Sequence, residues 1–257
     1  MTLKAGINTS FQVSVLEKIN IKVYKEDTVM GATSISVRSV SRFKIPEGTT
    51  NIKKANVTIG SIKTTTESLT VEGKVFKKFI GNYTRTIDDE ILVYNSDADE
   101  YQQYDNYQKA FEFDIFYSSS DNLLFLSTNT PITKKFLKEL EKNDDLDISY
   151  SPLAFNLKEI SNMMPQTKGV SFNSTDEGVS SKSFSGDEVD VNDEAIEALE
   201  NDEATKIIGT LDILGKSRTI MLTQSGTILS FTSLVDIKKE FPMLEFAIAT
   251  LIKIKVL

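Results

Sequence analysis

The chain has 257 residues, a net charge of −8, and apolar and charged fractions of 40% and 26%, which indicate a soluble globular protein of one large or two small domains. It contains no His, Cys or Trp. A thiolate nucleophile, a disulfide, a Ser-His-Asp triad and a thiolate or imidazole zinc site are therefore excluded. Any catalysis would have to use carboxylates, lysine, tyrosine or hydroxyl groups, with a hard divalent cation.

Two features of the sequence bear on its location. No apolar run approaches the roughly 20 residues that span a bilayer; the longest candidate is the short segment from Phe246 to Ile252. The opening segment MTLKAGINTSFQ lacks the apolar stretch of a signal peptide. We therefore expect a cytoplasmic protein with no membrane contact. We also expect no cofactor and no metal site.

The first part of the chain alternates apolar and polar residues, as half-buried strands of an antiparallel sheet do. This pattern occurs in KINIKVY and again in SISVRSVSRFKI, where the basic side chains occupy the polar positions. If the two segments pair, five basic residues share one solvent-exposed face: Lys18, Lys22, Arg38, Arg42 and Lys44. This face is the candidate nucleic-acid-binding site, because such side chains can follow a phosphate backbone.

Further strands are expected at KANVTI, EILVY, FEFDIFY and NLLFLS. A helix should follow, with Thr130 as its N-cap, Pro131 in its first turn and an apolar face that includes Phe136. A second short helix is expected after Pro152. The Ser-, Thr-, Asn- and Gly-rich residues 166–186 are expected to form a linker or mobile loop, with short β-like runs at GVSF and KSF. The segments KIIGTLDIL, RTIMLTQ and TILSF predict a three-stranded meander. A helix from about Met243 should end in a short strand.

Charge is divided unevenly along the chain. Residues 1–87 carry 14 basic and 6 acidic residues, whereas residues 88–257 carry 15 and 31. One acidic cluster has seven carboxylates and no basic residue between Arg85 and Lys109. The other has nine carboxylates in residues 186–204. Segregated charge of this kind favours docking to charged partners or head-to-tail association.

An amphipathic helix explains much of the second cluster. A helix from Asp193 to Glu200 puts its apolar and acidic side chains on separate arcs. We call the four carboxylates of this helix the acidic face, and they form the candidate partner-binding surface: Asp193, Glu194, Glu197 and Glu200. The segment lacks the central glycine and the ligand order of a calcium-binding loop, so no metal site is expected there.

These patterns predict an α+β fold, with a β-rich antiparallel N-terminal region followed by a smaller acidic α+β region. The expected domains are residues 1–128, with a basic outer face, and residues 129–257, with a single domain as the alternative.

Three functional hypotheses follow. The first is a non-catalytic interaction or assembly protein, with a protein partner or self-association. The chain is rich in Lys, Ile, Asn and Thr, which is typical of AT-rich bacterial, plasmid or phage genomes. This composition suggests a subunit of a bacterial defence or phage-related complex. The second is a nucleic-acid-binding module that uses the basic strands, although lysines on a solvated sheet explain the same pattern. The third is a divalent-metal-dependent nuclease, for which Glu72-Gly73-Lys74 has the acid-x-Lys form.

Overall fold

The computed structural model describes residues 33–187 and 189–257. Strands make up 53% of these residues and helices 19%. The described chain is mainly antiparallel sheet, so the α+β class expected from the sequence is wrong. Its α-helices are short, between 7 and 12 residues each. Segments rich in Thr, Ile, Val and Phe form strands in the second half as well as in the first, because such side chains pack well on a pleated surface.

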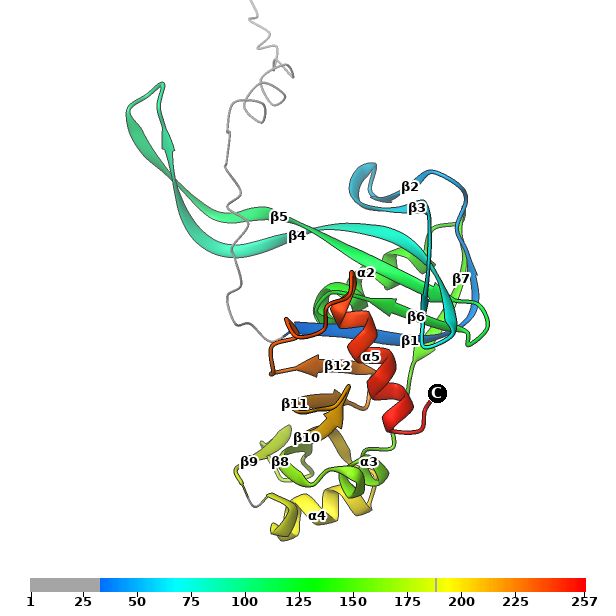
Figure 1. Ribbon diagram of the computed structural model, residues 1–257. Helices are drawn as coiled ribbons and strands as arrows, with labels where there is room; N and C mark the ends of the chain where they lie inside the picture. The colour runs from blue at the N-terminus through cyan, green and yellow to red at the C-terminus, as the bar shows by residue number, and fades with distance from the viewer. Residues whose placement is uncertain (1–32, 188) are drawn as a thin grey trace, which may run out of the picture. The chain divides into compact units, whose positions relative to one another are not determined.

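Twelve strands of the described residues form one sheet (Figure 1), and every pairing in it is antiparallel. The strands are β1 (Thr33–Lys44), β2 (Thr49–Lys54), β3 (Val57–Val71), β4 (Lys74–Asn95), β5 (Glu100–Ser118), β6 (Leu123–Leu126), β7 (Asp147–Pro152), β8 (Gln166–Asn173), β9 (Ser181–Ser185), β10 (Ala204–Ile213), β11 (Lys216–Thr223) and β12 (Thr227–Ser230). Their order is β2-β3-β4-β5-β6-β1-β12-β11-β10-β8-β9, and β7 pairs with β1. Strands from both sides of residue 128 therefore share one sheet.

The α-helices in the described part of the chain are α2 (Thr130–Glu141), α3 (Leu157–Met163), α4 (Asp193–Glu200) and α5 (Pro242–Lys253), with a 3-10 turn η1 (Val189–Val191). The predicted helix α2 is confirmed, but its N-cap is Asn129 and not Thr130. The Asn129 side chain accepts a hydrogen bond of 3.0 Å from the Ile132 backbone N–H, which satisfies a free donor of the first turn. None of the described helices is both long and apolar enough to cross a membrane.

The second half of the chain contains two confirmed predictions and two corrections. The meander is confirmed as β10, β11 and β12. The short β-like runs expected within residues 166–186 are confirmed as the hairpin β8–β9, but the segment is not a linker, because Val170 and Phe172 are buried in the core. The expected final strand is absent: α5 continues to Lys253, and no strand follows it.

Two apolar clusters lie on the two faces of the central strands. β6 shows the arrangement most clearly: Leu123 and Phe125 belong to a cluster with α3, α4 and α5, whereas Leu124 and Leu126 belong to a cluster with α2. Successive side chains of a strand point to opposite faces, so β6 is buried on both sides. The α2 cluster includes residues of β4 and β5 and forms the base of the candidate site.

Candidate interaction site

The structure separates the basic residues that were predicted to form one nucleic-acid-binding face. Lys18 and Lys22 lie outside the described residues. Arg42 and Lys44 are exposed and share the carboxylate of Asp147, with Arg42 Nε and Lys44 Nζ at 3.3 Å and 3.6 Å from its two oxygens. Ion pairs this exposed contribute little stability. Their part in nucleic-acid binding stays a prediction.

Arg38 does not lie on a solvent-exposed face, because only 2% of its surface is exposed. Its Nη1 atom donates hydrogen bonds to the backbone carbonyls of Val37 (2.7 Å) and Ser225 (2.9 Å). Burial lowers the pKa of the Arg38 guanidinium from its usual value, but an arginine remains charged at neutral pH. Arg38 therefore ties the β11–β12 turn to β1.

Two features of β1 explain why the alternation of apolar and polar residues wrongly predicted that Arg38 shares an exposed face with Arg42 and Lys44. The first half of this strand is buried on both faces. The register with β7 also shifts by one residue at Ser41, and a bulge of this kind reverses which face the following residues take. Arg38 therefore lies on the opposite face from Arg42 and Lys44, and the expected shared solvent face is wrong.

The acidic face of α4 is present as predicted. Asp193, Glu194, Glu197 and Glu200 are exposed, while the opposite side of the helix is buried through Ala195, Ala198 and Leu199. The Asn192 side chain caps the helix by accepting a hydrogen bond of 3.0 Å from the Ala195 backbone N–H. Lys182 pairs with Glu194 at 2.6 Å and with Asp176 at 2.9 Å. The amphipathic helix is confirmed, and its role in partner binding stays a prediction.

The acid-x-Lys triplet of the nuclease hypothesis lies at the β3–β4 turn. Lys74 Nζ is 2.6 Å from Asp121 Oδ1. Burial tends to raise the pKa of Asp121, but hydrogen bonds from Lys74, Ser118 and Ser120 outweigh it and hold that pKa below its usual value. Across residues 33–187 and 189–257, no group of three or more acidic side chains is placed to hold a metal ion. Lys74 is thus engaged in a structural ion pair.

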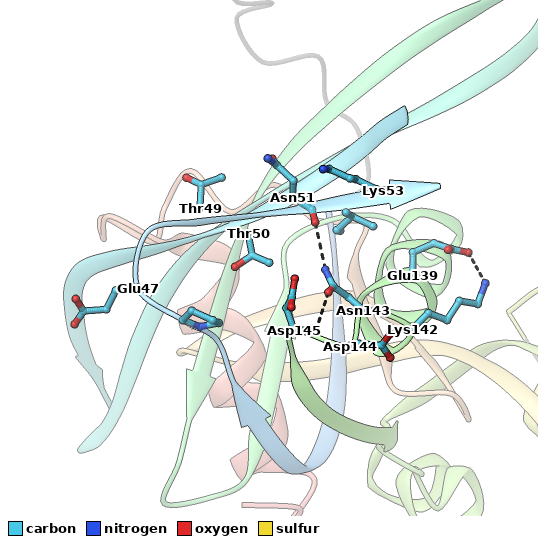
Figure 2. A pocket seen from close by; sticks show the side chains of 12 residues that line it. Glu47, Thr49, Thr50, Asn51, Lys53, Glu139, Lys142, Asn143, Asp144 and Asp145 are labelled. Carbon is cyan, nitrogen blue, oxygen red and sulfur yellow. Dashed lines mark hydrogen bonds and ion pairs between the residues drawn. The ribbon is translucent and has the colours of Figure 1, made fainter. Parts of the chain in front are cut away.

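A polar hollow of about 790 Å³ lies between β2 and the end of α2. Figure 2 shows Asn143 pointing across it to β2, where Asn143 Nδ2 donates a hydrogen bond of 3.2 Å to the Asn51 carbonyl. Lys142 pairs with Glu139 at 2.9 Å on the same side. The Asn143 hydrogen bond fastens the α2–β7 loop to β2, whereas the Lys142–Glu139 pair is local to the end of α2.

The outer part of the β4–β5 hairpin extends beyond the rest of the sheet (Figure 1). β3 pairs with β4 only as far as Tyr83, and β6 pairs with β5 only from Ile115. The two strands nevertheless stay paired with each other out to Asn95 and Glu100. We call residues 87–107 the arm. None of its residues is buried.

Within the described part of the chain, the arm's side chains make hydrogen bonds and ring contacts only with each other. The Tyr94 hydroxyl donates to Asp99 Oδ1 at 2.6 Å, and the Tyr94 and Tyr101 ring centroids are 5.3 Å apart. The hydrogen bond to Asp99 raises the pKa of Tyr94. The Tyr104 hydroxyl donates to Gln102 at 3.0 Å. A two-stranded ribbon with no core behind it is marginally stable in water, so the arm gains stability from any surface that covers it.

Apolar and aromatic side chains lie on both faces of the arm, and more of them lie on one face than on the other. The register pairs Ile87 with Tyr107, Leu92 with Gln103, and Tyr94 with Tyr101. Cross-strand partners share a face, and the extra residue at 89–90 leaves the alternation of β5 unchanged. We call the face with Ile87, Leu92, Tyr94, Tyr101 and Tyr107 the apolar face of the arm; it also carries Gln103 and Asp105, and the opposite face carries Ile91, Val93 and Tyr104. Leu92 and Tyr101 are 67% and 69% exposed, and contiguous exposed apolar groups typically mark interaction sites.

The arm is also strongly acidic. It carries seven carboxylates and no lysine or arginine: Asp88, Asp89, Glu90, Asp97, Asp99, Glu100 and Asp105. None of these carboxylates forms an ion pair with another described residue. Such a field attracts cations and repels the phosphates of nucleic acid. A surface that combines tyrosine and apolar side chains with negative charge is complementary to a basic surface of another protein.

Sequence reasoning recognised the acidic cluster of the arm but not the arm itself. The strands EILVY and FEFDIFY were predicted separately, whereas β4 and β5 run on to 22 and 19 residues. The signal was the short polar segment NSDADE between two Tyr-containing segments, which is typical of a hairpin turn.

No protein-family model and no curated protein matches the chain. The arm therefore defines the candidate site by its own geometry and charge.

Proposed function

We propose that this protein is a non-catalytic interaction or assembly protein whose arm docks on the basic surface of a protein partner. The observation that supports this is an exposed ribbon that combines seven carboxylates with a tyrosine-bearing apolar face and has no core behind it. Tyrosine supplies large contact area at low entropic cost, and carboxylates steer the approach of a basic partner. The arm thus has the chemistry of one half of an interface.

The charge of the arm favours a protein partner over nucleic acid. A nucleic-acid-binding ribbon would carry lysine and arginine, whose contacts release counterions from the phosphates, and the arm has neither. We place the protein within a larger assembly, of the kind found in bacterial defence or phage-related complexes, in the cytoplasm. The acidic face of α4 is a second candidate contact in that assembly.

Shortening the arm tests this proposal. Asp88 and Asn106 are register partners, so an Asn-Gly turn can replace residues 89–105 with two-residue hairpin geometry. Because the arm contributes nothing to the core, the shortened chain should fold with an unchanged unfolding midpoint but lose association. Association is measured as solution mass and as retention of proteins from source cells, each identified, purified and bound again.

The matched control reverses four exposed carboxylates that lie outside both the arm and the acidic face of α4, and it leaves the arm intact: Glu47→Lys, Glu177→Lys, Asp212→Lys and Glu240→Lys. We expect this control to keep the association that the shortened chain loses. Equal association by the shortened and full-length chains, in both measurements, would show that the arm is not the docking element.

A further inference from the structure

A group of exposed lysines lies on α2, the helix that packs on the base of the β4–β5 hairpin. Lys134, Lys135 and Lys138 are exposed, and at 100° per residue they fall within an arc of about 100°. In the described part of the chain, no ion pair or hydrogen bond involves any of these three side chains. We call them the α2 lysines. They form a positive patch that makes no ion pair within the described fold, and the exposed Glu141 borders it on the same helix.

The α2 lysines and the apolar face of the arm lie on the same side of the sheet. On the buried side of α2, the Phe136 ring centroid is 5.0 Å from that of Phe113 and 6.3 Å from that of Tyr83. Tyr83 and Ile87 share a face of β4, because the β4–β5 register is regular between them. The face that α2 covers at the base of the hairpin is therefore the one that continues, uncovered, as the apolar face of the arm.

We infer that the partner at the arm is a second copy of this chain, with the arm of each copy lying on the α2 lysines of the other. This inference rests on the proposed function and names the partner of the same site. An acidic part and a basic part on the same side of a chain can complement each other under a two-fold rotation, which exchanges the two parts. One such rotation brings both arms onto both α2 helices, so the association closes as a dimer.

The chemistry of the two halves matches beyond net charge. The aliphatic stems of lysines can cover the apolar face of the arm while their ammonium groups reach its carboxylates. The rings of Tyr94 and Tyr101 are exposed and available for cation–π contacts with the same ammonium groups. Direct pairing of one arm with another arm is disfavoured, because each brings seven carboxylates and no cation.

The test uses two charge-reversed variants of the full chain. The first carries Asp88→Lys, Glu90→Lys, Glu100→Lys and Asp105→Lys in the arm, and the second carries Lys134→Glu, Lys135→Glu and Lys138→Glu in α2. Sedimentation equilibrium should give the unmodified chain twice the 28.7 kDa of one chain. Each variant alone should be monomeric or bind itself at least about tenfold more weakly.

Mixing the two variants is the decisive step. In the mixture, the basic arm of one chain meets the acidic α2 of the other, and the acidic arm meets the basic α2, so both contacts are restored. We expect a one-to-one complex from two chains that do not dimerise alone. Circular dichroism and thermal melting confirm that each variant is folded, and reversal of the acidic face on α4 should leave the dimer intact.

Three results would overturn the inference: a monomeric unmodified chain at about 100 µM, an unaffected dimer in the α2 variant, or no complex in the mixture of folded variants. A dimer lost only on reversal of the α4 acidic face would place the interface there instead. If the chain is monomeric but its arm is still required to bind another purified protein, only this inference fails. If shortening the arm changes no association at all, the proposed function fails with it.

Discussion

Replacing Phe136 by alanine is expected to lower the free energy of unfolding by about 3–5 kcal/mol. The Phe136 side chain is fully buried and joins α2 to β4 and β5 through its ring contacts with Tyr83 and Phe113. The substitution removes those contacts and leaves a cavity that the surrounding strands fill only in part. Chemical denaturation, monitored by circular dichroism, measures the change.

The matched control for Phe136→Ala is Leu92→Ala in the arm. Leu92 is 67% exposed, so its removal should change the free energy of unfolding by less than about 0.5 kcal/mol. Equal losses for the two substitutions would mean that the arm is part of the folded core. That result would contradict the division between a stable base and an uncovered ribbon.

Replacing Gly226 by alanine is expected to cost at least about 3 kcal/mol of folding free energy. Gly226 has a positive φ of 80°, which an L-residue adopts at a cost. A Cβ atom there would also lie 2.6 Å from the Val37 carbonyl oxygen and 2.8 Å from that of Leu153. Backbone atoms cannot move aside as a flexible side chain can, so β1 and the β11–β12 turn would separate. Thermal and chemical denaturation check this prediction.

Gly215→Ala separates the two causes of that cost. Gly215 has a φ of 73°, but nothing lies within 4 Å of an added Cβ. Its substitution should therefore cost only the conformational part, roughly 1–2 kcal/mol. If both substitutions were equally costly, the close approach of the β11–β12 turn to β1 would have no energetic weight.

Local patterns in the sequence predicted much of the fold. The meander of β10, β11 and β12 followed from apolar alternation and two turns, and α2 and α4 followed from helical periodicity with capping residues. The α+β class was wrong because pattern strength does not reveal how many strands join one sheet. Residues 166–186 were expected to be a linker with short β-like runs, and those runs pair as β8 and β9; the tip of the β4–β5 hairpin, not expected as one unit, also consists of paired strands.

The candidate sites show where sequence reasoning stops. The acidic face of α4 was located correctly, because one helix and its periodicity are local properties. The basic face was predicted wrongly at Arg38, because β1 is covered on both faces there and because the bulge at Ser41 puts Arg42 and Lys44 on the opposite face; the alternation reveals neither. The acidity of the arm was visible, but its projection depends on where β3 and β6 stop pairing. The point at which the arm begins is therefore set by strands that are distant from it in the sequence.

Site-specific photo-crosslinking from the arm tests the central claim most directly. A photoreactive phenylalanine derivative at Leu92, which is 67% exposed, is compared with the same group at Val57, which is 64% exposed on β3. On irradiation in source cells, Leu92 should give a discrete crosslinked species and Val57 should not, because only the arm is covered by a partner. The mass of the species reports whether that partner is a second copy. No discrete species from Leu92, or the same species from Val57, would contradict the assignment of the arm as a docking element.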